Sequence, residues 1–129
     1  MSRAQGLLLL KECLKEEKKL NLFETPQAAN DEEVIQQLLE GKDVIIERIV
    51  STGHSSPEGF WYDQARDEWV AVLQGRAELL FESGEKLEMG PGDWVLIPAR
   101  SKHRVTSTSA DPPTIWLAVH GNLLATSSR

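Results

Sequence analysis

Seven short segments with alternating or β-branched residues follow one another through most of the chain, and they limit the fold more than any other feature. These segments are residues 44–50, 68–73, 76–82, 86–89, 94–97, 103–108 and 114–120. Turn residues separate most of them, among them Gly75, Gly84 and the Gly90-Pro91-Gly92 run. Glycine and proline at such short intervals favour strands that are joined by tight turns. We therefore expect a β-sandwich or barrel and not a sheet built from βαβ units.

The first forty residues have a different, helix-like pattern. In residues 4–20, leucines recur at helical spacing on one face, while lysines and glutamates cover the remainder. After the break at Thr25-Pro26, a second helix is predicted to begin at Asn30 or Asp31, with Val34, Ile35, Leu38 and Leu39 on its apolar face and Gly41 at its end. The sequence thus predicts a helical extension (1–42), a barrel (43–121) and a tail (122–129).

Length and composition restrict the class of protein. A chain of 129 residues suits one domain with one core. Its net charge of −6 opposes binding to nucleic acid or to an anionic membrane surface, so we expect neither as a partner. Cys13 is the only cysteine, which favours a cytoplasmic protein without disulfides. The longest aliphatic run, residues 7–10, is far too short to cross a bilayer, and we expect no signal peptide and no membrane anchor.

The segment from Gly92 to His103 is the strongest sign of a binding pocket. A glycine turn comes first, then a short buried strand, then Pro98 as a stop, and His103 stands at the start of the next strand. In an antiparallel barrel this arrangement presents one imidazole to the interior. A buried histidine suggests a pocket.

Two parts of the chain resemble the paired motifs of the cupin superfamily, which are small jelly-roll barrels, and the resemblance covers about residues 43–121. On the second cupin motif, Gly92, Pro98 and His103 match without a gap, while Arg100 and Ser107 replace a glycine and an asparagine. On the first motif, Glu68 and Gly75 match at the correct separation. The resemblance implies a mostly β fold, a cupin-type double-stranded β-helix, here with the two N-terminal helices added.

The same resemblance implies a candidate metal site that is only partly present. Metal-binding cupins use two histidines and a glutamate from the first motif and a histidine from the second; Glu68 and His103 correspond to the last two. The two other histidine positions hold Tyr62 and Gln64 with the shorter motif spacing, or Trp61 and Asp63 with the longer one. A divalent ion such as iron, manganese, nickel or zinc would then have Glu68, His103 and Gln64 as ligands. The alternative is that His103 is bonded to Glu68 or Tyr62 in a polar interior without a metal.

Other candidate residues have plainer interpretations. His54 lies in a loop, where solvent exposure is the default and a replacement ligand is the alternative, and His120 ends the last strand, where edge exposure is expected. Arg100 is placed at the barrel mouth by the motif match and would suit an anionic group of a substrate, while the plainer expectation is a solvent-exposed surface arginine. Tyr62, Gln64 and Arg100 are therefore the predicted pocket residues, and Glu68 and His103 are the candidate catalytic residues.

The sequence supports three functional hypotheses. The first is a cupin that binds a small molecule inside the barrel; the second is an enzyme, either a metal-dependent dioxygenase or a sugar isomerase, in which Glu68 and His103 act as ligands or as base and acid. The third is a metal-free module that senses a ligand without converting it. Because the leucine stripe of the first helix exceeds what a lone barrel must cover, we also expect a homodimer.

Overall fold

The computed structural model describes residues 19–26 and 32–125, and the described part is built from eight strands. They are β1 (Val34–Glu40), β2 (Val44–Ser51), β3 (Asp67–Gln74), β4 (Ala77–Phe81), β5 (Lys86–Met89), β6 (Trp94–Ile97), β7 (His103–Thr108) and β8 (Thr114–Gly121). All seven strand segments that the sequence predicts are confirmed, three of them with identical bounds. No helix in the described residues has the length and hydropathy needed to cross a membrane.

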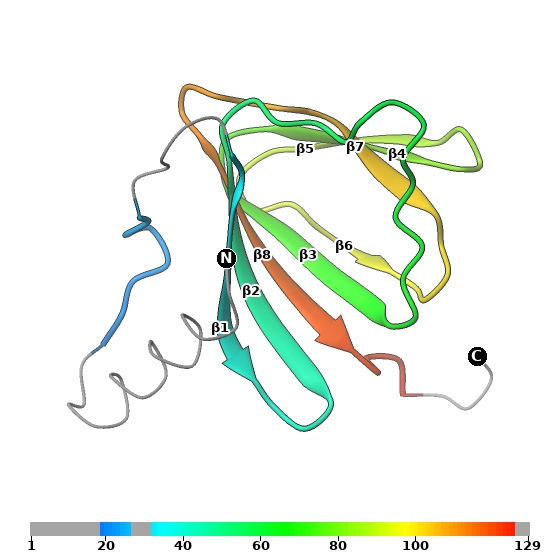
Figure 1. Cartoon of the computed structure of the whole chain (residues 1–129), viewed down its shortest axis with the longest axis horizontal. Helices are drawn as coiled ribbons and strands as arrows, with labels where there is room; N and C mark the ends of the chain where they lie inside the picture. Colours follow the sequence, from blue (N-terminus) through cyan, green and yellow to red (C-terminus); the bar gives the residue numbers. More distant parts are fainter. Residues whose placement is uncertain (1–18, 27–31, 126–129) are drawn as a thin grey trace.

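The strands form two antiparallel sheets that face each other (Figure 1). The larger sheet has the order β1-β2-β8-β3-β6, and the smaller has the order β5-β4-β7. Alternation along each strand directs one set of side chains into the space between the sheets. The main apolar cluster lies there and consists of Val70, Val72, Ala77, Leu79, Met89, Ile97, Trp116 and Ala118. The mostly β, jelly-roll type of fold is confirmed.

Strand β8 is central to the larger sheet because it pairs with β2 on one side and with β3 on the other. Ile49 of β2 lies opposite Trp116 of β8, and Glu68 of β3 lies opposite His120 of β8. Residues two apart on a strand share a face, so Trp116 and His120 are both directed to the barrel interior. This register brings residues from the two ends of the chain's β region into one site.

The second predicted helix is wrong, because residues 34–40 form strand β1. This strand pairs with β2 through a hairpin in which the Gly41 N–H donates to the Val44 carbonyl at 2.7 Å. The pairing shifts by one residue between Gln37 and Leu39. At such a bulge the alternation of side chains between the two faces of the strand is shifted by one residue. The apolar pairs 34–35 and 38–39 are therefore four residues apart, which is the spacing expected for one face of a helix. The larger sheet therefore begins before the predicted barrel boundary at residue 43.

The first predicted helix, residues 4–20, lies outside the described residues except at its end, where Lys19 and Leu20 are not helical. The neighbouring segment packs against β2. Arg48, buried on β2, donates to the side-chain oxygen of Gln36 on β1 and to the carbonyls of Asn21 and Leu22, each of these two at 3.2 Å. Residues 21 and 22 are thereby attached to the larger sheet.

Candidate functional site

A cavity of about 220 Å³ lies between the two sheets and contains the candidate residues. The residues that line it come from seven of the eight strands and from the two segments that precede β1 and β3. They are Glu33, Ile35, Glu47, Ile49, Tyr62, Gln64, Glu68, Val70, Leu79, Ile97, His103, Val105, Trp116 and His120. The lining is therefore mixed. Glu47, His120, Glu68 and His103 contact one another, while Glu33 lies apart from them and accepts from Ser51, whose hydroxyl oxygen also accepts from the Trp116 indole N–H.

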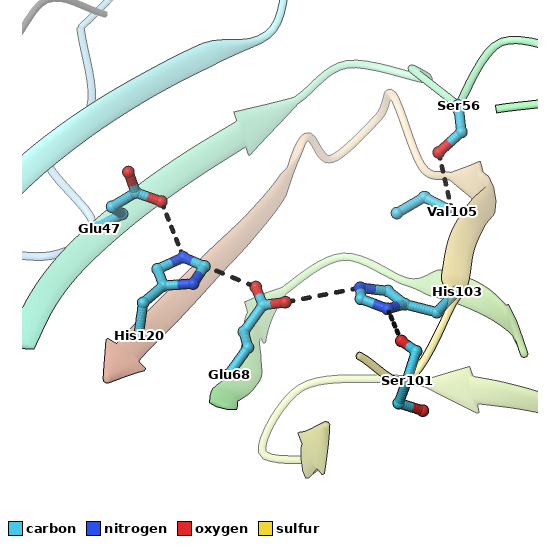
Figure 2. A network of polar contacts seen from close by, with 7 residues as sticks. All are labelled: Glu47, Ser56, Glu68, Ser101, His103, Val105 and His120. Carbon is cyan, nitrogen blue, oxygen red and sulfur yellow. Dashed lines mark hydrogen bonds and ion pairs between the residues drawn. The ribbon is translucent and has the colours of Figure 1, made fainter. Parts of the chain in front are cut away.

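Four of these residues form a chain of alternating carboxylates and imidazoles across the cavity, which we call the Glu47–His120–Glu68–His103 row (Figure 2). His120 Nε2 lies 3.1 Å from Glu47 Oε1 and 3.8 Å from Glu68 Oε2. The other oxygen of Glu68, Oε1, lies 3.5 Å from His103 Nε2. Glu68 thus presents one oxygen to each imidazole and connects β8 to β7.

The orientation of His103 is set by its surroundings. Its Nδ1 donates to the Ser101 carbonyl at 2.9 Å, which leaves Nε2 directed at Glu68. The Tyr62 ring stacks on the imidazole with centroids 5.3 Å apart, and the backbones of Tyr62 and His103 are joined by two hydrogen bonds. Because the Nδ1 contact fixes the tautomer, Nε2 is the atom that accepts or releases a proton toward the cavity.

The pKa values of both imidazoles in the row are raised, so their surroundings favour the protonated form. Burial on its own would lower the pKa of His103, but the hydrogen bond to Glu68, the Ser101 carbonyl and the charge of Glu68 together raise it above the usual value for histidine. For His120, the hydrogen bond to Glu47 raises the pKa, burial opposes this, and the charges of Glu68 and Glu47 add to the rise. Both imidazoles of the row therefore keep a proton to higher pH than an ordinary histidine does.

Tyr62 remains a neutral phenol at the same pH. Burial raises the pKa of its hydroxyl, and the charges of Glu33 and Glu68 raise it further. Glu33 lies at the exposed edge of the cavity, where its Oε2 accepts from the Ser51 hydroxyl at 2.6 Å. A phenol in this environment donates or accepts a hydrogen bond without carrying a charge.

Strand β3 is fixed next to the row by Asp67, whose side chain is fully buried. Its Oδ1 accepts from the Ala99 N–H at 2.9 Å, and its Oδ2 accepts from the Leu123 N–H at 3.0 Å. These bonds attach the start of β3 to the segment after β6 and to the segment after β8. Since Glu68 is the next residue, Asp67 determines where the Glu68 carboxylate lies.

A second attachment fixes β7 under the long connection between β2 and β3. The Ser56 hydroxyl accepts from the Val105 N–H at 2.9 Å, and the Ser56 N–H donates to the Val105 carbonyl at 2.8 Å (Figure 2). The same connection carries Tyr62 and Gln64 to the cavity. The hydrogen bonds of Asp67 and those between Ser56 and Val105 therefore hold in place the segments that surround His103.

Four of the five residues predicted for the site line the cavity, namely Tyr62, Gln64, Glu68 and His103. Arg100 does not line it: its side chain is 66% exposed and forms an ion pair with Asp63 at 3.4 Å. The turn there also gives Arg100 a positive φ of 63°.

The other two histidines differ from each other. His54 is not a lining residue, and its Nδ1 accepts from the Thr52 N–H at 2.9 Å within the same loop. His120 was expected at an exposed edge, but its side chain is only 16% exposed and belongs to the row. The period-two pattern from Trp116 to His120 on β8 was the available signal. Glu47 on β2 was also missed, although Ile45 and Ile49, two residues away on either side, share its face of the strand.

The donor atoms of this site do not fit a resident divalent metal. Tyr62 and Gln64 stand where the cupin motif has histidines, and the raised pKa of Tyr62 opposes the phenolate that a metal would need. Gln64 has only neutral donor atoms, which are weak ligands for iron, nickel or zinc. In residues 19–26 and 32–125, no three His, Cys, Asp or Glu side chains are arranged to hold a metal ion. The Glu68 carboxylate faces imidazoles on both sides instead.

Several solved structures are similar to this chain. A candidate mannose-6-phosphate isomerase from Ralstonia eutropha JMP134 is 46% identical, with a TM-score of 0.77 over 81% of this chain and 98% of that chain. A cupin superfamily protein from Desulfitobacterium hafniense DCB-2 is 19% identical, with a TM-score of 0.64 over 75% of this chain and 84% of its own. The polyketide cyclase RemF from Streptomyces resistomycificus is 16% identical, with a TM-score of 0.62 over 85% and 87%. The last two show a shared fold only.

A search of curated proteins found no significant match. The family model described as "Cupin domain" matches residues 48–120, a range that starts in β2, ends in β8 and includes Glu68, His103 and His120. Together with the jelly-roll sheets and the 46% identity to the Ralstonia eutropha structure, this match shows that the chain belongs to the cupin family.

Proposed function

We propose that this cupin binds a small organic molecule inside its barrel and places the polar group of that molecule against the Glu47–His120–Glu68–His103 row. The observation that carries the proposal is the position of Glu68, with one oxygen 3.5 Å from His103 and the other 3.8 Å from His120 at the polar part of the cavity. Ionisable groups that are buried and coupled in a cavity are common features of functional sites. The proposal requires no metal.

The row also supports proton transfer to or from a bound molecule. A general base must hold a lone pair and a general acid must hold a proton, and both must lie within hydrogen-bonding reach of the reacting group. Deprotonated His103 has a lone pair on Nε2, and its neighbour Glu68 stabilises the imidazolium that forms when the proton is taken up. His120 is supported by Glu47 in the same way. The site therefore has the parts of an acid–base catalyst as well as those of a binding module.

A second candidate, isomerisation of a sugar phosphate, is favoured by the name of the Ralstonia eutropha relative. Interconversion of an aldose and a ketose moves one proton between neighbouring carbons, which a base such as His103 with a neutral acid such as Tyr62 can support. The volume of the cavity argues against this candidate, because a sugar phosphate is larger than the space available. A cavity of about 150 Å³ holds benzene, so 220 Å³ corresponds to about nine non-hydrogen atoms, while a hexose phosphate has about sixteen.

The test is a thermal-shift screen of the full chain against small metabolites, followed by calorimetry on the compounds that stabilise it. Three variants accompany the native protein. Glu68→Gln changes the row, Val105→Phe fills the apolar part of the cavity, and Glu88→Gln removes an equal charge from an exposed position on β5. We expect stabilising compounds to act on the native protein and on Glu88→Gln, and to act at least ~10-fold more weakly on the other two.

Proton NMR in heavy water then distinguishes binding from catalysis. A catalyst incorporates deuterium into a bound carbon acid or converts it, and mannose 6-phosphate is included to test isomerisation directly. A ligand that stabilises the protein but stays unchanged indicates a binding or sensing module. Stabilisation that is equal in all four proteins would place the ligand outside the barrel and contradict the proposed function.

A further inference from the structure

The cavity has a polar part and an apolar part, and their arrangement restricts the kind of molecule that fits. The row occupies one part. The other is lined by the side chains of Ile49, Val70, Leu79, Val105 and Trp116. A molecule that is polar on every side, such as a sugar, would leave hydroxyl groups against these apolar side chains without partners, which is unfavourable. A molecule with one polar end and an apolar body satisfies both parts.

The charge of the cavity is a second restriction. Glu33, Glu47 and Glu68 contribute three carboxylates, against the two imidazoles of His103 and His120. The lining therefore carries net negative charge even when both histidines are protonated. Among the described residues, no lysine or arginine lines the cavity to offset it. An anionic ligand would be repelled in this partly enclosed space, and a cation would be attracted.

Entry to the cavity adds to the same preference. Glu33 lines the cavity and is itself exposed, so the part of the lining that faces solvent carries a carboxylate. Arg100, which would have favoured an anion at the mouth, is paired with Asp63 outside the lining. Both features oppose a phosphate or carboxylate group.

We infer that the ligand of this cupin is a compact organic amine of about nine non-hydrogen atoms in all, with its ammonium group at the Glu47–His120–Glu68–His103 row and an aromatic or branched aliphatic body in the apolar part. The inference rests on the proposed function, because it specifies which molecule the barrel binds. It differs from the substrate class that the Ralstonia eutropha relative's name suggests, which is anionic and polar throughout.

The experiment compares three probes with the same phenyl body and different polar ends: 2-phenylethylamine, 2-phenylethanol and phenylacetate. Binding to the full chain is measured by calorimetry at about pH 8 and repeated at about pH 6, where the histidines are protonated to a greater extent while the probes keep the same charge. We expect the amine to bind at least ~10-fold more tightly than the alcohol at both pH values. We expect phenylacetate to bind at least ~100-fold more weakly than the amine.

Two charge-removing variants identify the groups responsible. Glu47→Gln is expected to weaken binding of the amine roughly 10- to 100-fold, because a charged hydrogen-bond acceptor is replaced by a neutral one, and to weaken binding of the neutral alcohol by a clearly smaller factor. Glu33→Gln keeps a side-chain oxygen that can accept from the Ser51 hydroxyl, and it is expected to weaken only the amine, by about three-fold. The exposed control Glu88→Gln is expected to change neither.

The outcomes separate this inference from the proposed function. If phenylacetate binds as tightly as the amine and does so through Glu68, the barrel binds small molecules but the inference about charge is wrong. If none of the three probes binds while a compound of the metabolite screen does, the inference is again wrong and the proposed function stands. If the screen also yields no compound that depends on Glu68 and Val105, both are wrong.

Discussion

Replacing Glu68 with glutamine removes the one carboxylate that the two buried imidazoles share, with almost no change in shape. In the native protein this carboxylate lies 3.5 Å from His103 and 3.8 Å from His120. Its charge contributes to the raised pKa of both histidines. A group whose pKa is raised on folding stabilises the folded state fully below its unfolded pKa of about 6.5, and the contribution is lost as the pH rises through the folded pKa.

The size of the effect follows from the two contacts. Hydrogen bonds to charged groups contribute about 1.5–3 kcal/mol each. The His103 contact at 3.5 Å is longer than the usual ~2.7–2.9 Å, and the His120 contact at 3.8 Å is an ion pair beyond hydrogen-bond distance, so we use about 1–1.5 kcal/mol for each. Glu68→Gln is therefore expected to lower the free energy of unfolding by about 2–3 kcal/mol at about pH 5.5. This contribution is lost as the pH rises through the raised pKa values of the two imidazoles, and toward about pH 9 the effect of the substitution should fall to about 1 kcal/mol or less.

Urea unfolding at several pH values measures this difference, and NMR titration of the imidazole protons measures its cause. In Glu68→Gln the pKa values of His103 and His120 should both fall, and His54, outside the row, gives a reference signal. Glu88→Gln, on the exposed side of β5, should show no such change. An equal loss of stability at both ends of the pH range, or unchanged titration of both imidazoles, would refute the reasoning.

Four further predictions concern the fold, the metal and the assembly. Asp67→Ala leaves two backbone N–H groups without their acceptor and should lower the free energy of unfolding, measured in urea, by about 2–5 kcal/mol. The matched control is Asp93→Ala: the exposed Asp93 side chain accepts one hydrogen bond, and its loss should lower the same free energy by about 1 kcal/mol or less. Gly75→Ala places a Cβ 2.8 Å from the Thr114 Cα at a positive φ of 85°, and it should lower the free energy of unfolding by about 3 kcal/mol or more. Gly84→Ala has open space around it at a φ of 96° and should lower that free energy by only about 1 kcal/mol. Equal losses for the two variants would contradict this reasoning. Dialysis against a chelator should change neither the melting temperature nor ligand binding, and restoration of either by added zinc or iron would show that the donor set holds a metal after all. The homodimer expected from the leucine stripe stays a prediction, and light scattering that gives a monomer at micromolar concentration would contradict it.

The strands were predictable from the sequence because their signals are local. Alternation of apolar residues and the glycine and proline turns both act within a few residues, and they gave seven of the eight strands. Strand β1 was missed because its bulge between Gln37 and Leu39 mimics helical spacing. Pairing with β2 decides whether residues 34–40 form a strand or a helix, and β2 lies beyond the residues over which the helix-like pattern is read.

The site was predictable only as far as the motif positions reach. Glu68 and His103 occupy cupin motif positions, so the resemblance identified both of them. Glu47 and His120 belong to no motif, and their proximity depends on β8 lying between β2 and β3. In this strand order, residues about seventy positions apart in the sequence come into contact, and Glu47 and His120 are one such pair. No local sequence pattern specifies the strand order. For Arg100 the motif gives a position along the chain but not the direction of the side chain, and of the two expectations the exposed surface arginine is the one found.

The register of β8 therefore controls both the fold and the function proposed for it. In the observed register, Trp116 and His120 face the interior together, one in the apolar part of the cavity and one in the row. A slip of one residue would turn both to the outer face and put Leu117 and Val119 inside, which would remove the second imidazole from Glu68. The buried Asp67, which accepts from the Leu123 N–H directly after β8, opposes such a slip. Asp67 consequently has a functional consequence without touching a ligand: it keeps His120 within reach of Glu68.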